Sequence, residues 1–477
     1  MNYRMIKNIL GWILIFEAAF MALPLLTAAI YREKVFFSFL ISIGICLLIG
    51  FLLVCRKPKD RTLYSREGFV IVALSWITLS AFGALPFCIS GEIPNYIDAL
   101  FETVSGFTTT GSSIVPAVEE LSHAALMWRS FTHWVGGMGV LVFIMAFVPL
   151  SGGNNMHIMR AESPGPSVSK LVPKVKTTAM ILYLIYIGLT LLEFVLLLFG
   201  SMNAFEALNI SFATAGTGGF GTKNTSLAEY SSYVQIVVTV FMLLFSINFA
   251  SYYLIIMRKF KDAFTSEVKA FIGIVLTLIV IITLNSRGVF DTLGDTLKHV
   301  SFTVASIIST TGFATADFNE WPQLSRLCLV LAMFIGACAG STGGGLKISR
   351  VIIWVKSIAK EFYIMIHPKQ IKKVTVDKHP VEHEVVRATN VYMVCYIIVF
   401  SVSVLLVSID NHDLITNFTA VAATINNIGP GLELVGPTSN FAFFSPFTKL
   451  VLIFDMLAGR LELFPMLVLF FPGTWKK

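Results

Sequence analysis

Four short runs of small polar residues and glycine are the part of this sequence whose residue types and spacing could do chemistry. Their central glycines stand at positions 111, 219, 312 and 429, at intervals of 108, 93 and 117 residues. Carbonyl oxygens in such a run can replace the hydration shell of a monovalent cation, and glycine has the backbone freedom to aim them inward. The alternative is four ordinary turns rich in Gly and Thr. We expect a pseudo-fourfold cation filter formed by Thr109, Thr110, Gly111, Thr217, Gly218, Gly219, Thr310, Thr311, Gly312, Asn427, Ile428 and Gly429.

A short apolar stretch precedes each run and must position it. With about 10 to 14 residues it is too short to cross a bilayer core, which needs about 20 helical residues. The stretches start near acidic or Asn residues, at 98–102, 206–209, 291–295 and 411–413. We therefore expect four re-entrant half-helices, with acids complementing their first turns and their negative C-terminal ends pointing to the membrane centre. Irregular backbone at that depth is tolerated where it lines a wet cavity, so the four ends should converge on one pore axis.

The composition places these elements in a membrane. Hydrophobic residues make up 56% of the 477 residues and charged residues only 13%, about half the charged share of a soluble domain. A water-soluble enzyme is therefore excluded. Ten long apolar segments are available as crossings, at 8–30, 35–55, 68–90, 124–150, 177–200, 233–257, 268–284, 324–355, 388–409 and 447–471.

From the third crossing onward, one helix, half-helix, helix unit occurs four times, which indicates one architecture repeated around an axis. We expect an all-α polytopic membrane protein with four helix–pore-loop–helix repeats around a central pore and two extra N-terminal transmembrane helices. The expected divisions are 1–67 for the extra helices and 68–176, 177–267, 268–387 and 388–477 for the four repeats.

The distribution of charge predicts the orientation. Of the 35 Lys and Arg residues, 26 fall in one set of connecting segments, whose net charge is +17, whereas the opposite set has a net charge of −7. Cytoplasmic loops carry an excess of Lys and Arg, so both termini are expected in the cytoplasm. The acidic outer face would concentrate cations at an entrance. Anionic lipid headgroups suit the basic segments 151–177 and 347–388, and no nucleic-acid partner is needed to explain the overall charge.

Six motifs carry a resemblance to a known family: SREGF (65–69), GFTTTG (106–111), WVGGMG (134–139), GACAGSTGGGLK (336–347), NNIGPG (426–431) and GRLE (459–462). They resemble the TrkH/KtrB/HKT superfamily of potassium transporters, and the two helices before the first repeat are similar to its TrkH branch. The resemblance implies K⁺ uptake across the bacterial cytoplasmic (inner) membrane, with K⁺ at the filter residues as the only bound metal and no cofactor of the chain's own. It also implies a homodimer and a TrkA-like cytosolic ring of nucleotide-binding RCK domains as regulator.

The selectivity expected from the resemblance depends on the filter glycines. In this family each filter loop carries one key glycine, and members with Ser at the first of these positions tend to favour Na⁺. Glycine at all four positions here implies a preference for K⁺. The pair Asn427-Ile428 departs from the Thr-Gly pattern, so the second and fourth arms are not simple copies and we expect weaker K⁺/Na⁺ discrimination than in a true fourfold channel. A less selective Na⁺/K⁺ transporter or an H⁺-coupled cation symporter of the same fold is the alternative.

The segment 336–346 interrupts the last helix of the third repeat. Its polar and glycine residues cannot hold a stable helix in hydrocarbon unless they face water or protein. By resemblance it is an intramembrane gate beneath the filter; a packing kink and a phosphate-binding loop are the alternatives, and the latter lacks a preceding strand and has Leu346 before its lysine. The expected gate residues are Gly336, Gly340, Ser341, Thr342, Gly343, Gly344, Gly345 and Lys347.

Arg460 is the one cation deep in a predicted crossing, where an unpaired charge is costly and usually faces the bundle interior. The resemblance implies that it lies on the pore wall below the filter as a charge barrier to K⁺, with Glu462 and Asp455 as possible partners. A structural salt bridge to Asp455, Glu193 or Glu17 is the alternative.

Other residues that could do chemistry have simpler explanations. The HPVEH segment 379–383 fits a zinc pattern, but its proline opposes the helix that would bring the ligands together. His123 and His133, near Arg129, are expected to be helix-mouth and packing residues, and the six cysteines are expected to be apolar packing residues. An intramembrane enzyme would cluster its titratable groups at one depth, whereas the buried ones here are scattered over three crossings. We therefore expect a transporter and no enzyme.

Overall fold

The computed structural model describes residues 1–56, 64–137, 139 and 175–476. This part of the chain is almost entirely helical. Its one β-element is a hairpin of two short antiparallel strands, β1 (Thr375–Val376) and β2 (His379–Pro380), with Thr375 opposite Pro380. The segment 151–177, which the sequence assigns to a basic linker, lies almost wholly outside the described residues.

Three helices precede the repeats: α1 (Tyr3–Phe20), α2 (Ala22–Tyr31) and α3 (Phe36–Val54). Helices α1 and α3 pack closely because glycines meet at their crossing. A Cβ atom at Gly11 would lie 2.8 Å from the carbonyl oxygen of Gly50, and one at Gly50 would lie 2.9 Å from that of Gly11. Close approach of backbones through small residues is typical of helix pairs in membranes.

The four repeats follow in chain order. The first contains α4 (Ser65–Gly83), α5 (Leu85–Ser90), the half-helix α6 (Tyr96–Phe107), η1 (Val118–Glu120) and α7 (His123–Gly137). The second contains α10 (Val175–Phe199), the half-helix α11 (Ala204–Gly216), α12 (Ser232–Phe245), α13 (Phe249–Ile256) and α14 (Phe260–Ala263). The third contains α15 (Ser266–Asn285), the half-helix α16 (Leu293–Ile308), η2 (Phe318–Glu320), α17 (Gln323–Ile335), α18 (Ile348–Ile366) and the hairpin. The fourth contains α19 (His383–Val407), η3 (Ser408–Asp410), the half-helix α20 (Leu414–Ile425), η4 (Glu433–Val435), α21 (Pro446–Arg460), α22 (Phe464–Phe470) and η5 (Pro472–Thr474).

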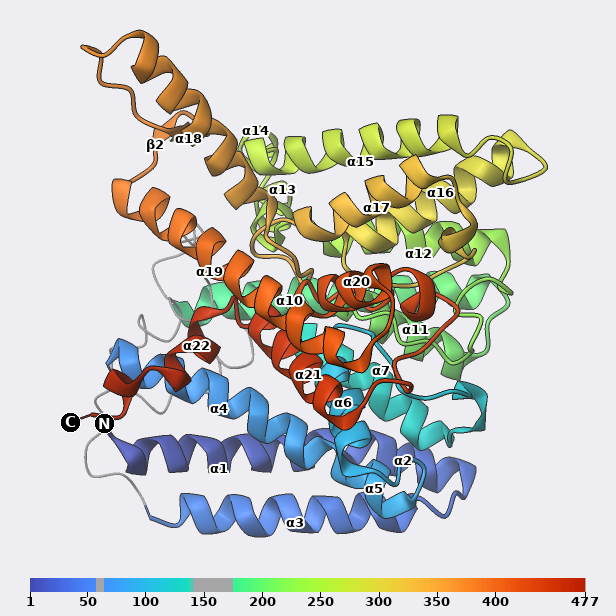
Figure 1. Ribbon diagram of the computed structural model, residues 1–477. Helices are drawn as coiled ribbons and strands as arrows, with labels where there is room; N and C mark the ends of the chain where they lie inside the picture. Colours follow the sequence, from blue (N-terminus) through green and yellow to red (C-terminus); the bar gives the residue numbers. More distant parts are fainter. Residues whose placement is uncertain (57–63, 138, 140–174, 477) are drawn as a thin grey trace.

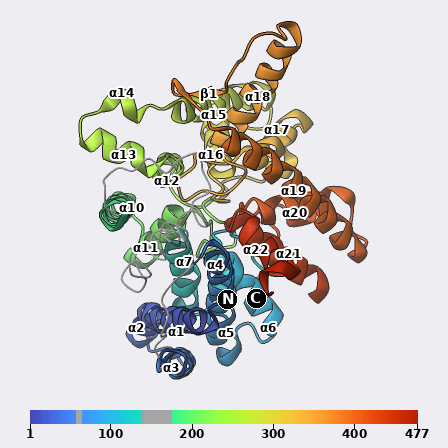
Figure 2. The same ribbon diagram turned by 90° about the vertical axis from the view of Figure 1, so that its left-hand side faces the viewer.

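The long helices run side by side, and the two chain ends lie at the same end of the bundle (Figure 1). In the view along the helices, the repeats follow one another around a centre in chain order, from blue through green and yellow to red (Figure 2). Within the described residues, six helices are long and apolar enough to cross a membrane, or seven if α12 and α13 count as one bent crossing. The expected all-α polytopic architecture is confirmed.

Apolar side chains cover the outside of the bundle. Helices such as α3, α10 and α19 expose many large hydrophobic residues, which a water-facing surface would not tolerate in such numbers. On α19 these exposed residues are Val391, Val394, Ile397, Ile398, Val402 and Leu405. This outward apolar surface is the one expected against lipid tails.

The expected crossing over 233–257 is strongly bent, because α13 leaves α12 at an angle of 93°. At the break, the carbonyl of Ser246 accepts a hydrogen bond from the amide of Cys338 (3.1 Å), and the amide of Phe249 donates to the carbonyl of Gly340 (3.0 Å). These backbone groups are satisfied by the third repeat instead of by a continuing helix.

Two other expected crossings are also interrupted. The segment 447–471 is divided into α21 and α22, whereas the sequence predicts one crossing there. The segment 324–355 is divided into α17 and α18 around 336–347, as its glycine and polar residues predict. The second half of the expected crossing 124–150 lies outside the described residues.

Candidate functional site

All four half-helices begin with a side-chain cap. The side chains of Asn95, Asn203, Thr292 and Asp413 accept hydrogen bonds of 2.7–3.0 Å from backbone amides of the first turn. Three of the helices also carry an acid in that turn: Asp98, Glu206 and Asp295. In the fourth the cap itself is acidic; burial opposes ionisation of Asp413, but hydrogen bonds from Thr416 hold the pKa of its carboxyl below the usual value. The positive ends of the four helix dipoles are thus complemented at one side of the bundle.

The C-terminal ends of the half-helices share one backbone turn. One or two residues after the helical end, each repeat has a residue in a left-handed conformation, and the next amide donates to the carbonyl five residues earlier at 2.8–2.9 Å. This is the Schellman arrangement, which usually has glycine at the left-handed position. Here Thr and Asn occupy it, at a cost of about 1 to 2 kcal/mol each. These residues are Thr109 (φ 55°), Thr217 (φ 55°), Thr310 (φ 59°) and Asn427 (φ 55°).

Two residues further on, each run reaches its central glycine, whose φ is also positive: 82° at Gly111, 80° at Gly219, 84° at Gly312 and 101° at Gly429. Each glycine faces a carbonyl of a neighbouring repeat. A Cβ atom at these glycines would lie less than 3.0 Å from the carbonyl oxygens of Gly218, Thr311, Ile428 and Thr110, respectively. The central glycine of each repeat thus contacts a carbonyl of the next repeat in chain order, and that of the fourth repeat contacts a carbonyl of the first. The four turns form a closed ring of backbone carbonyls around one axis.

A polar cavity of about 200 Å³ opens onto this ring, and all four glycines line it. Its wall also carries hydroxyl and amide groups from the segments that follow the ring, including Ser112, Ser113, Asn224, Ser439 and Asn440. These groups add polar atoms to the wall of the cavity next to the carbonyls. The ring therefore has a polar vestibule.

The fourth repeat differs from the others in its side chains but keeps their backbone. Asn427 and Gly429 have the same left-handed conformations as their counterparts. The side-chain amide of Asn427 donates to the hydroxyl of Thr110 (2.9 Å) and to the carbonyl of Met456 (2.9 Å), so it holds the ring to the first repeat and to α21. The side chain of Ile428 is fully buried. The departure from the Thr-Gly pattern leaves the carbonyl positions in register.

The loop 336–347 lies against the ends of two half-helices. The amide of Gly344 donates to the hydroxyl of Thr310 (2.6 Å), and the amide of Gly345 donates to the carbonyl of Asn426 (3.1 Å). A Cβ atom at Gly344 would lie less than 3.0 Å from that same carbonyl. The ammonium of Lys347 donates to the carbonyl of Gly343 and closes the loop on itself. Helix α17, and no strand, precedes the loop, so it lacks the context of a phosphate-binding loop.

Arg460 joins this loop to the first repeat. Its Nη1 donates to the carbonyl of Thr342 (2.8 Å) and its Nη2 to the carbonyl of Gly136 in α7 (2.7 Å). No ion pair connects Arg460 with a carboxylate among the residues that the structure describes. The guanidinium is held by backbone dipoles, and the alternative of a salt bridge finds no support in this part of the chain.

The carboxylates considered as partners of Arg460 have other surroundings. Glu462 pairs with Arg350, whose guanidinium lies 4.0 Å from the ring centre of Tyr392. Asp455 accepts a hydrogen bond from the hydroxyl of Ser403 (2.6 Å). The side chains of Glu17 and Glu193 are fully buried, and their oxygens have no hydrogen-bond partner among the described residues.

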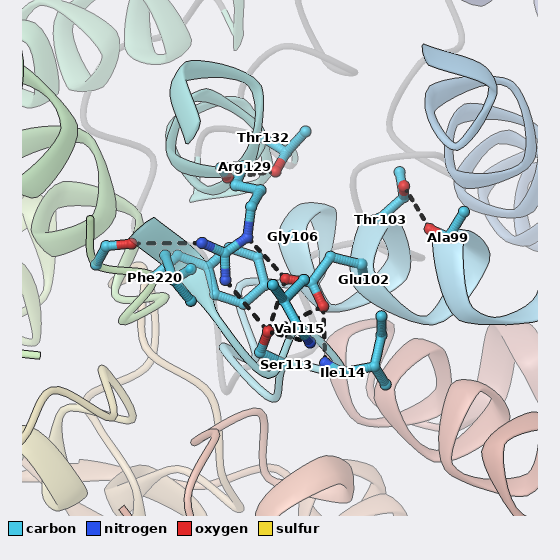
Figure 3. A network of polar contacts seen from close by, with 12 residues as sticks. Ala99, Glu102, Thr103, Gly106, Ser113, Ile114, Val115, Arg129, Thr132 and Phe220 are labelled. Carbon is cyan, nitrogen blue, oxygen red and sulfur yellow. Dashed lines mark hydrogen bonds and ion pairs between the residues drawn. The ribbon is translucent and has the colours of Figure 1, made fainter. Parts of the chain in front are cut away.

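Sequence reasoning missed a buried ion pair behind the ring (Figure 3). Nε of Arg129 in α7 donates to Glu102 of the half-helix α6 at 2.7 Å, and their side chains are only 2% and 0% exposed. Glu102 also accepts hydrogen bonds from the hydroxyl of Ser113 (3.0 Å) and the amide of Ile114 (2.9 Å). Arg129 reaches the carbonyl of Gly221 in the second repeat (3.3 Å). The sequence places Glu102 among the acids at the start of the first half-helix and gives Arg129 no role of its own. The available signal is that the two charges lie on two neighbouring elements of one repeat.

His133 has a packing role, as the sequence predicts. Its fully buried ring lies between the first two repeats, with Nδ1 2.8 Å from the carbonyl of Gly106 and Nε2 3.2 Å from the amide of Phe220. One nitrogen must donate and the other must accept, which fixes a neutral imidazole. His123 is the first residue of α7. Its Nδ1 lies 2.9 Å from the carboxylate of Glu33, and its ring stacks on Tyr31 with ring centres 3.8 Å apart.

A bundle of apolar helices around a closed ring of backbone carbonyls, entered from a polar cavity, defines a multi-pass membrane transport protein. Residues 35–476 match the TrkH family, described as cation transport proteins. The chain belongs to this family, as the sequence motifs predict, and it is a transporter and not an enzyme.

Relatives and a solved structure agree with this assignment over the full length of the chain. The chain is 37% identical to the Trk system potassium uptake protein TrkH of Salmonella typhimurium, with all of both chains covered. It is 31% identical to TrkG of Escherichia coli, covering 100% of this chain and 99% of that one. The crystal structure of the potassium transporter TrkH from Vibrio parahaemolyticus superposes with a TM-score of 0.89 at 32% identity, covering 100% of each chain.

Proposed function

We propose that this protein takes up K⁺ across the bacterial cytoplasmic membrane and that the carbonyl ring is its selectivity filter. The observation that carries the proposal is the closure of the ring, in which the glycine of each repeat packs on a carbonyl of the next. Four equivalent carbonyls around one axis can replace the hydration shell of a monovalent cation. The names of the relatives as potassium uptake proteins support K⁺ as that cation. K⁺ would be bound only as the transported ion.

The loop 336–347 is the gate in this proposal, and Arg460 is the charge barrier below the filter. The loop touches the residues that end the third and fourth half-helices, so an ion leaving the ring on that side meets it first. Arg460 is bonded to the loop and to α7, so one side chain both places a positive charge there and holds the loop in position. Opening would require these hydrogen bonds to break.

The basic side of the protein faces the cytoplasm in this proposal, with both termini there. The segment 347–388 carries nine of the Lys and Arg residues, and α18 with its hairpin projects beyond the bundle at the end where the termini lie (Figure 1). This projection suits a cytosolic regulator, and membership of a Trk system favours a TrkA-like ring that binds nucleotide. A homodimer and contacts with anionic lipid are further parts of the proposal.

One observation favours the H⁺-coupled symporter as a second candidate. Glu17 and Glu193 are fully buried without hydrogen-bond partners in the described structure, and each could carry a proton. A less selective Na⁺/K⁺ pathway rests on the unusual pair Asn427-Ile428.

Purified protein in liposomes, with the regulatory partner added, tests these candidates through Rb⁺ uptake driven by a K⁺ gradient. Uptake that is independent of a pH gradient supports a channel-like pathway, and dependence on that gradient supports symport. Inhibition of Rb⁺ uptake by excess Na⁺ measures selectivity. Absence of Rb⁺ flux under all these conditions would refute K⁺ uptake.

A further inference from the structure

The ion pair between Glu102 and Arg129 lies where the first repeat contacts the second, at the entrance to the carbonyl ring. The guanidinium of Arg129 donates three hydrogen bonds. Nε donates to the carboxylate of Glu102, Nη2 to the hydroxyl of Ser113 (3.3 Å), and Nη1 to the carbonyl of Gly221 in the second repeat. The carbonyl of Ser113 accepts a hydrogen bond from the amide of Phe441 in the fourth repeat (2.8 Å). The buried Arg129 thus holds the segment that leaves the first glycine of the ring and joins it to the second repeat, while the backbone of Ser113 joins the same segment to the fourth. Figure 3 shows Arg129 between Glu102 and Ser113.

This arrangement occurs in only one of the four repeats. Glu102 stands nine residues before its ring glycine, and the residues at that position in the other repeats are Ile210, Thr303 and Ala420. Ser113 stands two residues after the glycine, where the others have Gly221, Ala314 and Gly431. The backbone of the ring repeats four times, but this charged support does not.

The location of Arg129 adds an electrostatic consequence. Arg129 lines the same vestibule as the four ring glycines, so its charge is felt where a cation enters. Glu102 cancels that charge at a distance of 2.7 Å. Without the carboxylate, a buried guanidinium beside the entrance would repel the cations that the vestibule must admit.

We propose that Glu102 and Arg129 are positioning residues that set the K⁺/Na⁺ discrimination and the cation affinity of the entrance on one side of the ring. The inference rests on the proposed filter. Its geometric part depends on the fork of Arg129, since a lysine at this position offers a point charge and cannot reach all three partners. Its electrostatic part depends on the charge of Glu102.

The test is Rb⁺ uptake into liposomes by the full-length protein, measured with increasing Rb⁺ and with competing Na⁺. Glu102→Gln should raise the Rb⁺ concentration for half-maximal uptake by about tenfold, as expected for one unpaired charge acting over about 10 Å at an effective dielectric constant of about 20. Arg129→Lys keeps the charge balance, so it should leave that concentration near the wild-type value while reducing discrimination against Na⁺. Ser113→Ala keeps the ion pair intact and serves if Glu102→Gln does not fold; it should lower discrimination against Na⁺.

Glu433→Gln is the matched control. It removes the ion pair of Glu433 with Arg326, which also joins neighbouring repeats at the outer ends of their helices but is 41% and 16% exposed. We expect it to leave affinity and discrimination unchanged, because exposed ion pairs contribute little.

Wild-type affinity and discrimination in folded Glu102→Gln and Ser113→Ala proteins would overturn the inference, and so would an equal effect of Glu433→Gln. Substitution of a ring glycine separates this result from failure of the filter itself. If Gly219→Ala alters discrimination while Glu102→Gln does not, only the inference fails; if neither does, the proposed filter fails.

Discussion

Replacing Gly219 by alanine is the most direct test of the carbonyl ring. The residue has a φ of 80°, which costs an L-residue about 1 to 2 kcal/mol. The new Cβ atom would also lie less than 3.0 Å from the carbonyl oxygen of Thr311. Because that oxygen must retreat by about 1 Å or more to a normal separation, overpacking adds about 1 to 3 kcal/mol. We expect the free energy of unfolding to fall by about 2 to 5 kcal/mol in all.

The effect on the ion follows from the same displacement. An oxygen with about half a negative charge that moves from about 3 Å to about 4 Å from a monovalent cation loses about 0.7 kcal/mol of attraction at an effective dielectric constant of about 20. This corresponds to about threefold weaker cation binding. Since one of four carbonyls no longer matches the others, discrimination between K⁺ and Na⁺ should fall as well.

The assay is Rb⁺ uptake into liposomes with competing Na⁺, normalised to folded protein and paired with a thermal unfolding measurement. Gly91→Ala is the control, because Gly91 has a φ of 81° but a Cβ atom there would meet no other atom within 4 Å. It should show only the backbone strain, with normal selectivity. Wild-type selectivity in a folded Gly219→Ala protein would refute the view that the ring selects the ion.

Three further substitutions test the loop and the packing. Arg460→Gln removes two charge-assisted hydrogen bonds of about 1.5 to 3 kcal/mol each, so flux without the regulator should rise by about tenfold or more; an unchanged leak would show that Arg460 does not hold the gate. Gly344→Ala places a Cβ atom against the carbonyl at the end of α20 and should raise the same leak, whereas lower flux would contradict the assignment of the loop as a closed gate. Gly50→Val should lower the free energy of unfolding by about 1 to 3 kcal/mol through overpacking against α1, with normal uptake per folded molecule. Gly44→Val on the same helix, where a Cβ meets nothing within 4 Å, should leave the free energy of unfolding unchanged. If both substitutions lowered that free energy equally, the α1–α3 contact would not be tight.

The ring and the half-helices could be predicted from sequence because both depend on backbone properties that composition reveals. A glycine after a stretch too short to span, repeated four times, requires no knowledge of tertiary contacts. The interruption between α17 and α18 was predictable for a similar reason, since its glycines and hydroxyls oppose a helix in lipid. Asn427 is consistent with the same turn as the threonines of the other repeats, because asparagine tolerates the left-handed conformation that the turn requires.

The breaks in α12 and before α22 could not be predicted from composition. Both segments are largely apolar, and α12 ends because backbone groups near Ser246 bond to the loop of the third repeat. The pair Glu102 and Arg129 was missed for a different reason. A charge near a predicted helix mouth is expected to be solvent-exposed until the fold shows that another repeat covers it.

The chain carries all four arms of the ring, so each arm can differ from the others. In an assembly of four identical subunits, a residue such as Arg129 would be present four times, and four guanidinium groups would surround the entrance. A single polypeptide can place one supporting cation behind one arm and leave the rest without it. Four arms on one polypeptide thus permit a one-sided electrostatic adjustment of a nearly symmetric carbonyl ring, and single substitutions can alter it in small steps.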